Sequence, residues 1–343
     1  MYTLMEVQKL YNNIMMKTAF LTEMEFEGKI PDYHPNMRTE FAWMNALQSD
    51  HFNLRKLERV QNYDAVFLIL PKGRVFLSSD GGEILSDVEN PISDILSFDF
   101  TTYLKTKNNK KIFYIQEGPT WWFNDYGMVD QINFYNQLHS FDGILTHNIH
   151  DVKFYKGLFP DKLVQPIGTL MRDFYIKDLQ PKPEDKTIIG GNFAHWYGGF
   201  QSYMIAQEFS NPIWAQESHC KRPGEDQLPG LEHFPRLVWN KWMEELSTFK
   251  YAVHLMPTVA AGTFSLNCAY FGIPCIGNKL VDTQNICFPE LSVDVEDVES
   301  ARLLAQRLKT DKEFYNKCSS DAKLNYQKYF NTELWKTRIL SIL

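Results

Sequence analysis

The chain has 343 residues, of which 44% are hydrophobic and 22% are charged, and its formal net charge is −7. The length favours two domains of roughly 150 residues over a single core, and the composition is that of an ordinary soluble globular protein. The acidic balance argues against a surface dominated by affinity for nucleic acid, although a local basic channel is compatible with it.

The cysteines and the apolar segments indicate a cytoplasmic protein. The five cysteines form no CxxC or CxxH pattern, and an odd, scattered set is typical of reduced thiols in a cytosolic protein. No apolar run reaches the ~18 residues of a membrane span. The N-terminal segment lacks the continuous apolar core and the cleavage site of a signal peptide. We therefore expect a cytoplasmic protein without a membrane span.

The first predicted strand, residues 17–22 (KTAFLT), leads into a long polar loop and then a helix over residues 38–47. Glu23, His34 and Arg38 lie in or beside this loop, at the end of the expected sheet where ligands bind. A carboxylate or imidazole there could deprotonate a bound hydroxyl. Glu23 is therefore a candidate catalytic residue, and His34 and Arg38 are candidate acceptor contacts. Solvated loop charges are the alternative for each of them.

Further strands are predicted at residues 65–70 (AVFLIL) and 112–116 (IFYIQ). A basic turn at residues 105–111 precedes the second of these strands. It is either a solvated loop or a contact with a phosphate backbone.

The segment directly after that strand, residues 117–126 (EGPTWWFNDY), combines four aromatic residues with two carboxylates. A tight turn cannot bury all four rings, so we expect a stacking platform with acid/base groups beside it. Glu117 and Asp125 are candidate catalytic residues, and Trp121 and Trp122 are candidate acceptor contacts. An aromatic plug between two lobes is the alternative.

His147 follows a predicted strand at residues 143–146 (GILT), which places it at the same edge of the sheet. It is a candidate for a direct catalytic role, although a lone histidine is more often structural. The spacing of His147 and His150 is tight for a helix-borne metal pair, and no third ligand is obvious. We therefore expect no bound metal.

The second half begins with a polar linker, residues 182–186, and a strand at residues 187–193 (TIIGGNF). Its central feature is the stretch 251–277 (YAVHLMPTVAAGTFSLNCAYFGIPCIG), predicted to form a strand–loop–helix–strand unit of a parallel sheet. Thr263 is the expected helix N-cap, and Gly272 ends the helix. The helix N-terminus suits a phosphate. An ordinary doubly wound domain is the alternative, because the loop matches neither the dinucleotide fingerprint nor a P-loop.

The same stretch resembles the donor-binding segment near the C-terminus of GT-B glycosyltransferases, with GIPCIG in the place of their closing xxGxPVI strand. Retaining members usually carry two spaced glutamates, and this chain has Val259 and Asn267 in those positions. Asn267 could still bond a ribose hydroxyl, whereas Val259 cannot bond a sugar. Retention and inversion therefore both stay open.

The resemblance implies an α/β protein of the GT-B fold, with two Rossmann-like lobes facing a central cleft and a C-terminal helix returning to the first lobe. Residues 1–180 would form the acceptor lobe, residues 187–320 the nucleotide-sugar donor lobe, and residues 321–343 the bracing helix. The donor would be a nucleotide-sugar, expected to be a UDP-sugar, with no cofactor and no metal required. We expect a monomer.

The resemblance also assigns donor binding to loops of the second lobe. Glycine amides and a protonatable histidine after the first strand would replace one cation. Lys221 and Arg222 are candidates for the missing diphosphate cations, with plain surface charge as the alternative. The full predicted set is Asn192, His195, Gly198, Gly199, Lys221, Arg222, Gly262, Thr263, Ser265 and Asn267.

Two blocks, HPNMRTEFAWMNAL and IQEGPTWWFNDY, are similar to glycosyltransferases encoded by tailed bacteriophages. This similarity implies hexosyl or pentosyl transfer, in the host cytoplasm, to a hydroxymethylated pyrimidine of the 5-hydroxymethylcytosine type in double-stranded DNA. An aromatic loop would suit a base extruded from the duplex. A saccharide, lipid or protein hydroxyl is the alternative acceptor. The rivals from other classes are a non-catalytic nucleotide-sugar binder and an enzyme acting on the nucleotide-sugar itself.

Overall fold

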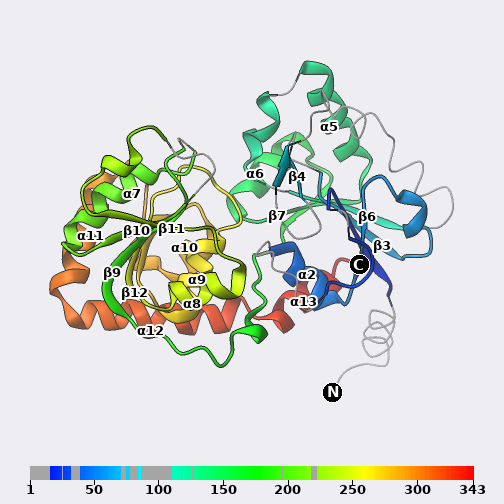
Figure 1. The fold of residues 1–343 in the computed structure, drawn as a ribbon. Coiled ribbons are helices and arrows are strands. Elements are labelled where there is room, and N and C mark those ends of the chain that lie inside the picture. Colours follow the sequence, from blue (N-terminus) through cyan, green and yellow to red (C-terminus); the bar gives the residue numbers. More distant parts are fainter. Residues whose placement is uncertain are drawn as a thin grey trace. The chain divides into compact units, whose positions relative to one another are not determined.

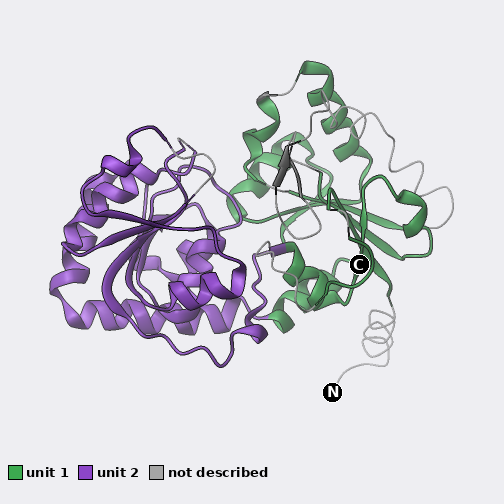
Figure 2. Cartoon of the chain, in the orientation of Figure 1, with its two compact units in different colours: residues 1–36, 40–167, 332–343 green, residues 37–39, 168–331 purple. Residues whose placement is uncertain are grey.

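The computed structural model describes residues 16–24, 26–31, 39–70, 75–77, 83–85, 110–116, 118–125, 127–194, 196–217 and 222–343. The chain divides into two compact units (Figure 2). Unit 1 comprises residues 1–36, 40–167 and 332–343, and unit 2 comprises residues 37–39 and 168–331. Within the described residues, no helix is both long enough and apolar enough to cross a membrane.

Unit 1 is built on a six-stranded parallel sheet (Figure 1). Its strands lie in the order β2-β1-β3-β6-β7-β8, so the direction of winding reverses between β1 and β3. β3 is apolar and buried along its length, as expected for a parallel strand covered on both faces. The strands are β1 (Thr18–Thr22), β2 (Asp50–Asn53), β3 (Ala65–Leu68), β6 (Lys111–Ile115), β7 (Gly143–Thr146) and β8 (Leu163–Pro166).

Helices flank this sheet, and a small antiparallel ladder, β4 (Val75–Leu77) with β5 (Glu83–Leu85), lies in the connection between β3 and β6. The helices of unit 1 are α2 (Thr39–Leu47), α5 (Met128–Ser140), α6 (Ile149–Leu158) and α13 (Thr332–Leu340), with the short 3-10 helices η1 (Leu57–Val60) and η2 (Thr120–Asp125).

β2 is not among the strands predicted from the sequence, in which residues 65–70 follow the first strand as the next apolar run. β2 has the sequence DHFN and pairs in parallel with β1. His51 and Asn53 are both buried in it. A strand with buried polar residues gives no apolar run, so the pattern does not predict it.

Unit 2 contains a second six-stranded parallel sheet, in the order β11-β10-β9-β12-β13-β14. Along the chain this is the order 3-2-1-4-5-6, and the winding reverses between β9 and β12. Figure 1 shows α7 and α11 on one face of the sheet and α8 and α9 on the other. The strands are β9 (Glu184–Ile189), β10 (Ile213–Gln216), β11 (Leu231–Phe234), β12 (Phe249–His254), β13 (Cys275–Asn278) and β14 (Ser292–Val293).

The first strand of unit 2 begins and ends earlier than expected. Residues 182–186 were expected to be a linker, yet β9 starts at Glu184, whose amide donates to the Thr248 carbonyl at 2.7 Å. The expected strand to residue 193 stops at Ile189, because Gly191 takes a φ of 73° that leaves the extended conformation.

The helices of unit 2 include α12, which packs against α9. After α12 the chain enters α13, whose residues from Thr332 onward belong to unit 1. The helices are α7 (Gly199–Ala206), α8 (Trp239–Leu246), α9 (Thr263–Phe271), α10 (Asp282–Cys287), α11 (Val298–Thr310) and α12 (Lys312–Tyr329), with the 3-10 helices η3 (Asp173–Tyr175), η4 (Gln207–Phe209), η5 (Glu225–Gln227) and η6 (Pro289–Leu291). Two parallel sheets with flanking helices confirm the predicted α/β class.

Candidate functional site

In unit 2, the carboxyl ends of β9 and β12 mark the point where the sheet reverses its winding. Neighbouring connections leave toward opposite faces at such a point, and ligands of open α/β sheets bind in the resulting crevice. β9 is followed by Gly190, whose amide donates to the Val253 carbonyl at 2.9 Å. β12 ends at His254. The residues around these two positions therefore form the candidate donor site.

The loop after β9 is held directly against the end of β12. Gly198 has a φ of 63°, and a Cβ there would overlap the Leu255 carbonyl oxygen. Ser202, in the first turn of α7, donates to the Gly198 carbonyl and accepts from the Leu255 amide, each at 2.9 Å. A Cβ on Gly199 would overlap the Asn192 carbonyl oxygen. Both predicted glycines are therefore required by close backbone approach.

Asn192 shapes this loop, and its carboxamide oxygen accepts from the Ala194 amide at 2.8 Å. Arg222 is exposed, and its backbone amide donates to Glu225 at 3.0 Å. His195 and Lys221 lie outside the described residues. The donor-binding roles of all four stay predictions.

The loop after β12 turns into α9 through Gly262, which has a φ of 69°. Gly262 occupies the N-cap position, so the expectation of Thr263 as N-cap is wrong by one residue. The reason is conformational, because a left-handed turn at the cap favours glycine over threonine. The amides of the first helical turn lack intrahelical partners, which suits an anionic ligand.

Buried hydroxyl groups hydrogen-bond to the backbone carbonyls of this turn. The Gly262 carbonyl accepts from Thr283 of α10 at 2.8 Å and from Ser265 at 3.1 Å. Ser265 and Thr283 are themselves 2.7 Å apart, oxygen to oxygen. Thr169 donates to the Ala261 carbonyl. Ser265 therefore supports the loop from within the protein, and its predicted contact with the donor stays a prediction.

Asn267 lies inside the helix pair rather than at the surface. It is buried, and in the amide orientation that satisfies both neighbours it donates to the Thr263 carbonyl at 3.2 Å and accepts from the Trp242 indole at 3.0 Å. The bond from Trp242 joins α8 to α9, and the bond to Thr263 lies within α9. A ribose contact by Asn267 stays a prediction.

His254, at the end of β12, is a residue of the candidate donor site that is not among those predicted from the sequence. Its ring packs edge-on against Phe264 of α9, with ring centroids 4.9 Å apart. Burial lowers the pKa of His254 to about 4, so the imidazole is neutral at ordinary pH. The available signal was a histidine in the last position of a mostly apolar strand.

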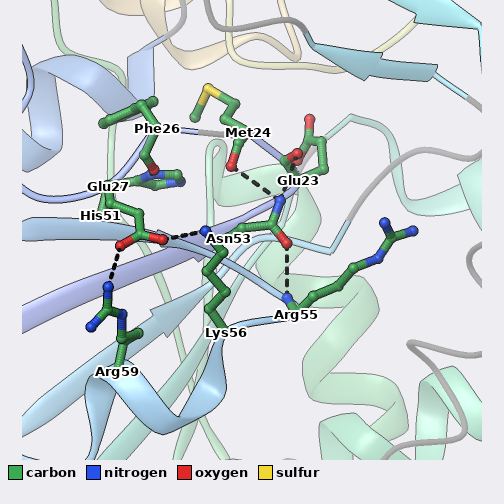
Figure 3. A network of polar contacts seen from close by, with 9 residues as sticks. All are labelled: Glu23, Met24, Phe26, Glu27, His51, Asn53, Arg55, Lys56 and Arg59. Atoms are coloured by element: carbon green, nitrogen blue, oxygen red, sulfur yellow. Dashed lines mark hydrogen bonds and ion pairs between the residues drawn. The ribbon is translucent and has the colours of Figure 1, made fainter.

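In unit 1, the winding reverses between β1 and β3, and Glu23 directly follows β1. Glu23 is 6% exposed. Asn53, at the end of β2, donates to the carbonyls of Glu23 and Met24 at 3.1 and 3.2 Å (Figure 3). Its carboxamide oxygen accepts from the Arg55 amide at 2.9 Å. Asn53 therefore fixes the backbone that carries Glu23.

His51 of β2 fixes the same loop at a second point. Its Nδ1 lies 2.7 Å from the Phe26 carbonyl, so Nδ1 carries the proton and donates. Its Nε2 lies 2.8 Å from the Thr22 hydroxyl, and its ring stacks on Phe26 at 4.0 Å between centroids. The loop is thus bonded to β2 through buried polar groups.

Glu27 closes the network at the surface. It pairs with Lys56 and, at 3.1 Å, with Arg59 (Figure 3). The hydrogen bond from Lys56 lowers the pKa of Glu27 below its usual range. Because these groups are exposed, the pairs contribute to loop position more than to stability.

The remaining unit 1 candidates differ in exposure. His147 is buried and stacks on Trp43 of α2 at 5.3 Å, and Trp43 stacks in turn on Trp335 of α13 at 6.2 Å. Trp121 is 39% exposed and Trp122 is half-buried.

A single buried ring anchors this aromatic segment. Phe123 stacks on Phe134 of α5, with the ring centroids 3.6 Å apart. His34, Arg38, Glu117 and the side chain of Asp125 lie outside the described residues, as does most of the basic turn at residues 105–111. Among the described residues, no cluster of His, Cys, Asp or Glu side chains could hold a metal ion.

No protein-family model and no curated protein matches the sequence. Solved structures do match. An α-glucosyltransferase in complex with UDP and a 13-mer DNA containing an HMU base aligns with a TM-score of 0.61 at 10% identity, over 95% of this chain and 99% of that chain. Anabaena HepE in complex with UDP aligns with a TM-score of 0.62 at 8% identity, over 95% and 99% of the two chains.

A longer protein also matches. S. aureus TarM, in complex with UDP, aligns with a TM-score of 0.58 at 10% identity over 84% of this chain. The alignment covers 57% of TarM, so the chain spans little more than half of that protein's length. At these identities the likenesses show the fold, which is GT-B as the sequence resemblance implied.

Proposed function

We propose, from the GT-B fold, that the protein is a glycosyltransferase that moves a sugar from a nucleotide-sugar, expected to be a UDP-sugar, to a hydroxyl. The observation that carries this proposal is a pair of close-packed glycine turns at the winding reversal between β9 and β12. These turns, at Gly198 and Gly262, present the N-termini of α7 and α9 at that edge of the sheet. Helix N-termini bind phosphates through backbone amides and the helix dipole.

In this proposal the diphosphate is both the anchor and the leaving group. Negative charge grows on it as the sugar departs, and preorganised amides aimed at that charge lower the barrier. The turn at Gly262 cannot relax easily, since buried Thr283 and Ser265 hold its carbonyl. Arg222 of the neighbouring loop adds a cation. The chemistry assigned to these residues requires no metal.

Unit 1 is assigned the acceptor. Glu23 stands at the winding reversal of that sheet and is held by Asn53, which suits a base that accepts the proton of the acceptor hydroxyl. His147, at the end of β7, is the second candidate base. Trp121 presents an exposed ring on which a planar group could stack.

For the acceptor we propose a hydroxymethylated pyrimidine in double-stranded DNA. The support is the alignment over 99% of the length of an α-glucosyltransferase solved with hydroxymethylated DNA. An exposed tryptophan also suits a base taken out of the duplex. A saccharide, lipid or protein hydroxyl is the alternative, which the net charge of −7 favours.

The test is a transfer assay with mass spectrometry. The full chain is incubated with UDP-glucose or UDP-N-acetylglucosamine and a duplex containing 5-hydroxymethylcytosine or 5-hydroxymethyluracil. An unmodified duplex of the same sequence is the control. The proposal predicts that only the hydroxymethylated strands gain one sugar. UDP release without any gain in DNA mass would overturn the DNA acceptor, and an absence of UDP release with every acceptor class would overturn the transferase assignment.

A further inference from the structure

One imidazole nitrogen at the winding reversal of unit 2 takes no part in the hydrogen bonding of the described residues. Its position follows from topology, because His254 ends β12 at the edge shared with β9, where the winding reverses. The Nε2 atom of His254 is shielded from solvent and has no hydrogen-bond partner among the described residues.

We propose that His254 is a donor-contacting residue, whose uncharged imidazole hydrogen-bonds the nucleoside diphosphate part of the nucleotide-sugar. This inference rests on the proposed function, since it assumes that the crevice holds a nucleotide-sugar. It goes further by assigning the contact to a residue for which the sequence motif gives no indication.

The first support is steric. A Cβ on Gly190 would lie 2.5 Å from Cγ of His254 and 2.8 Å from Cδ1 of Phe264. The imidazole therefore lies across the end of β9, in space that only a glycine leaves open. Gly190 has no positive φ, so its small size and not its backbone conformation is what the structure uses.

The second support is the energetics of an unpaired polar atom. Buried ring nitrogens normally have partners, because a buried polar atom without one destabilises the fold. His51 in unit 1 shows the usual arrangement, with both ring nitrogens bonded. A phenylalanine would pack at position 254 without that cost. A histidine that carries the cost in a ligand crevice indicates a partner supplied by the ligand.

The surroundings of His254 explain why the contact is uncharged. The imidazole lies against Gly190 at the end of β9 and Phe264 of α9, neither of which titrates. Burial without a carboxylate partner lowers the pKa of the imidazole to about 4. A neutral imidazole offers one donor and one acceptor, which fits a directional hydrogen bond rather than a phosphate clamp.

The experiment measures UDP binding by calorimetry and thermal stability without ligand, for the full chain and three variants. His254→Phe keeps the ring and removes both nitrogens, and Gly190→Ala leaves the imidazole intact but displaces it. His150→Asn, an exposed histidine on α6, is the control. We expect His254→Phe to weaken UDP binding about tenfold or more, with an unfolding temperature equal to or above that of the unmodified chain. Gly190→Ala should also weaken UDP binding, and His150→Asn should leave it unchanged.

The outcomes separate this inference from the proposed function. If the unmodified chain binds no nucleoside diphosphate, the proposed function is wrong, and the inference that rests on it is wrong as well. If the unmodified chain binds UDP, and a folded His254→Phe variant binds it equally well, the inference alone is wrong. If His254→Phe fails to fold, the imidazole has a structural role and the inference is likewise wrong.

Discussion

Gly198 lies so close to Leu255 that a Cβ on residue 198 would overlap the Leu255 carbonyl oxygen. The turn that starts α7 is thus pressed against the backbone just beyond β12, and Ser202 bonds to both sides of the contact. The loops after β9 and β12 therefore form one closely packed edge, which is the proposed donor site.

Gly198→Ala should destabilise the protein and weaken donor binding. The variant would place a Cβ into the Leu255 carbonyl at a left-handed backbone position, which costs about 1–2 kcal/mol for the conformation alone. Chemical denaturation and UDP calorimetry measure the two effects. Gly157→Ala is the matched control, since nothing lies within 4 Å of a Cβ there and its φ is not positive. Equal unfolding midpoints for the two variants would contradict the close approach.

Glu23→Gln should reduce the transfer rate without changing UDP affinity. The amide cannot take the proton of an acceptor hydroxyl, and removal of a general base costs about 10²- to 10⁴-fold in rate. Steady-state kcat and UDP calorimetry provide the measurements, with exposed Glu58→Gln on η1 as the control. A Glu23→Gln variant with full kcat would eliminate Glu23 as the base and leave His147 as the candidate to test.

Asn53→Ala should lower kcat through the position of Glu23. The change removes the donor to the Glu23 and Met24 carbonyls and leaves them buried, at a cost of about 1–3 kcal/mol in stability. We expect kcat to fall while KM for the UDP-sugar stays constant, because the proposed donor site lies in unit 2. Asn53→Asp keeps an oxygen that accepts from the Arg55 amide but has no N–H donor for the two carbonyls. We therefore expect its kcat to be reduced nearly as much as that of Asn53→Ala. A change in KM alone would refute the positioning role.

Trp121→Ala should weaken acceptor binding and leave the fold intact. The ring is 39% exposed, whereas neighbouring Phe123 is buried against Phe134 and anchors the segment. Loss of a stacked base costs about 1–3 kcal/mol, which is roughly 5- to 150-fold in acceptor affinity. KM for hydroxymethylated DNA is the measurement, and exposed Val129→Ala on α5 is the control. An unchanged KM would show that the acceptor does not bind at η2.

His254 should make the fold sensitive to mild acid. Its pKa is about 4 in the folded chain against an ordinary value of 6.5, so the unfolded chain binds more protons between those values. Protonation between those values favours the unfolded chain, so the free energy of unfolding is highest above about pH 6.5 and falls as the pH approaches about 4. The drop in unfolding temperature from about pH 7.5 to about pH 5 should be smaller in His254→Phe than in the unmodified chain. Identical drops would show that the imidazole is not held neutral.

The sheet architecture was predictable because parallel strands buried on both faces leave apolar runs such as AVFL and GILT in the sequence. The glycines at 198 and 262 were predictable for a related reason, since glycines beside a strand end mark close approach of loops. β2 was not predictable, because His51 and Asn53 are buried only with the help of partners elsewhere in the chain.

Side-chain contacts in the candidate site were harder to predict than the elements that carry them. Ser265 and Asn267 follow the helix start in sequence, but the helix turns both side chains into the protein, toward Thr283 and Trp242. His254 appears in the sequence as one more residue of a strand. Its place at the winding reversal depends on strand order, which local sequence patterns do not contain.

The most direct test of the central claim is a calorimetric titration of the full chain with UDP. A donor crevice in unit 2 predicts one saturable site per chain, with affinity lost in Gly198→Ala and retained in Gly157→Ala. If UDP and the other nucleoside diphosphates all produce no binding heat and no thermal stabilisation of the folded chain, this edge of unit 2 is not a donor site, and the assignment as a glycosyltransferase is wrong.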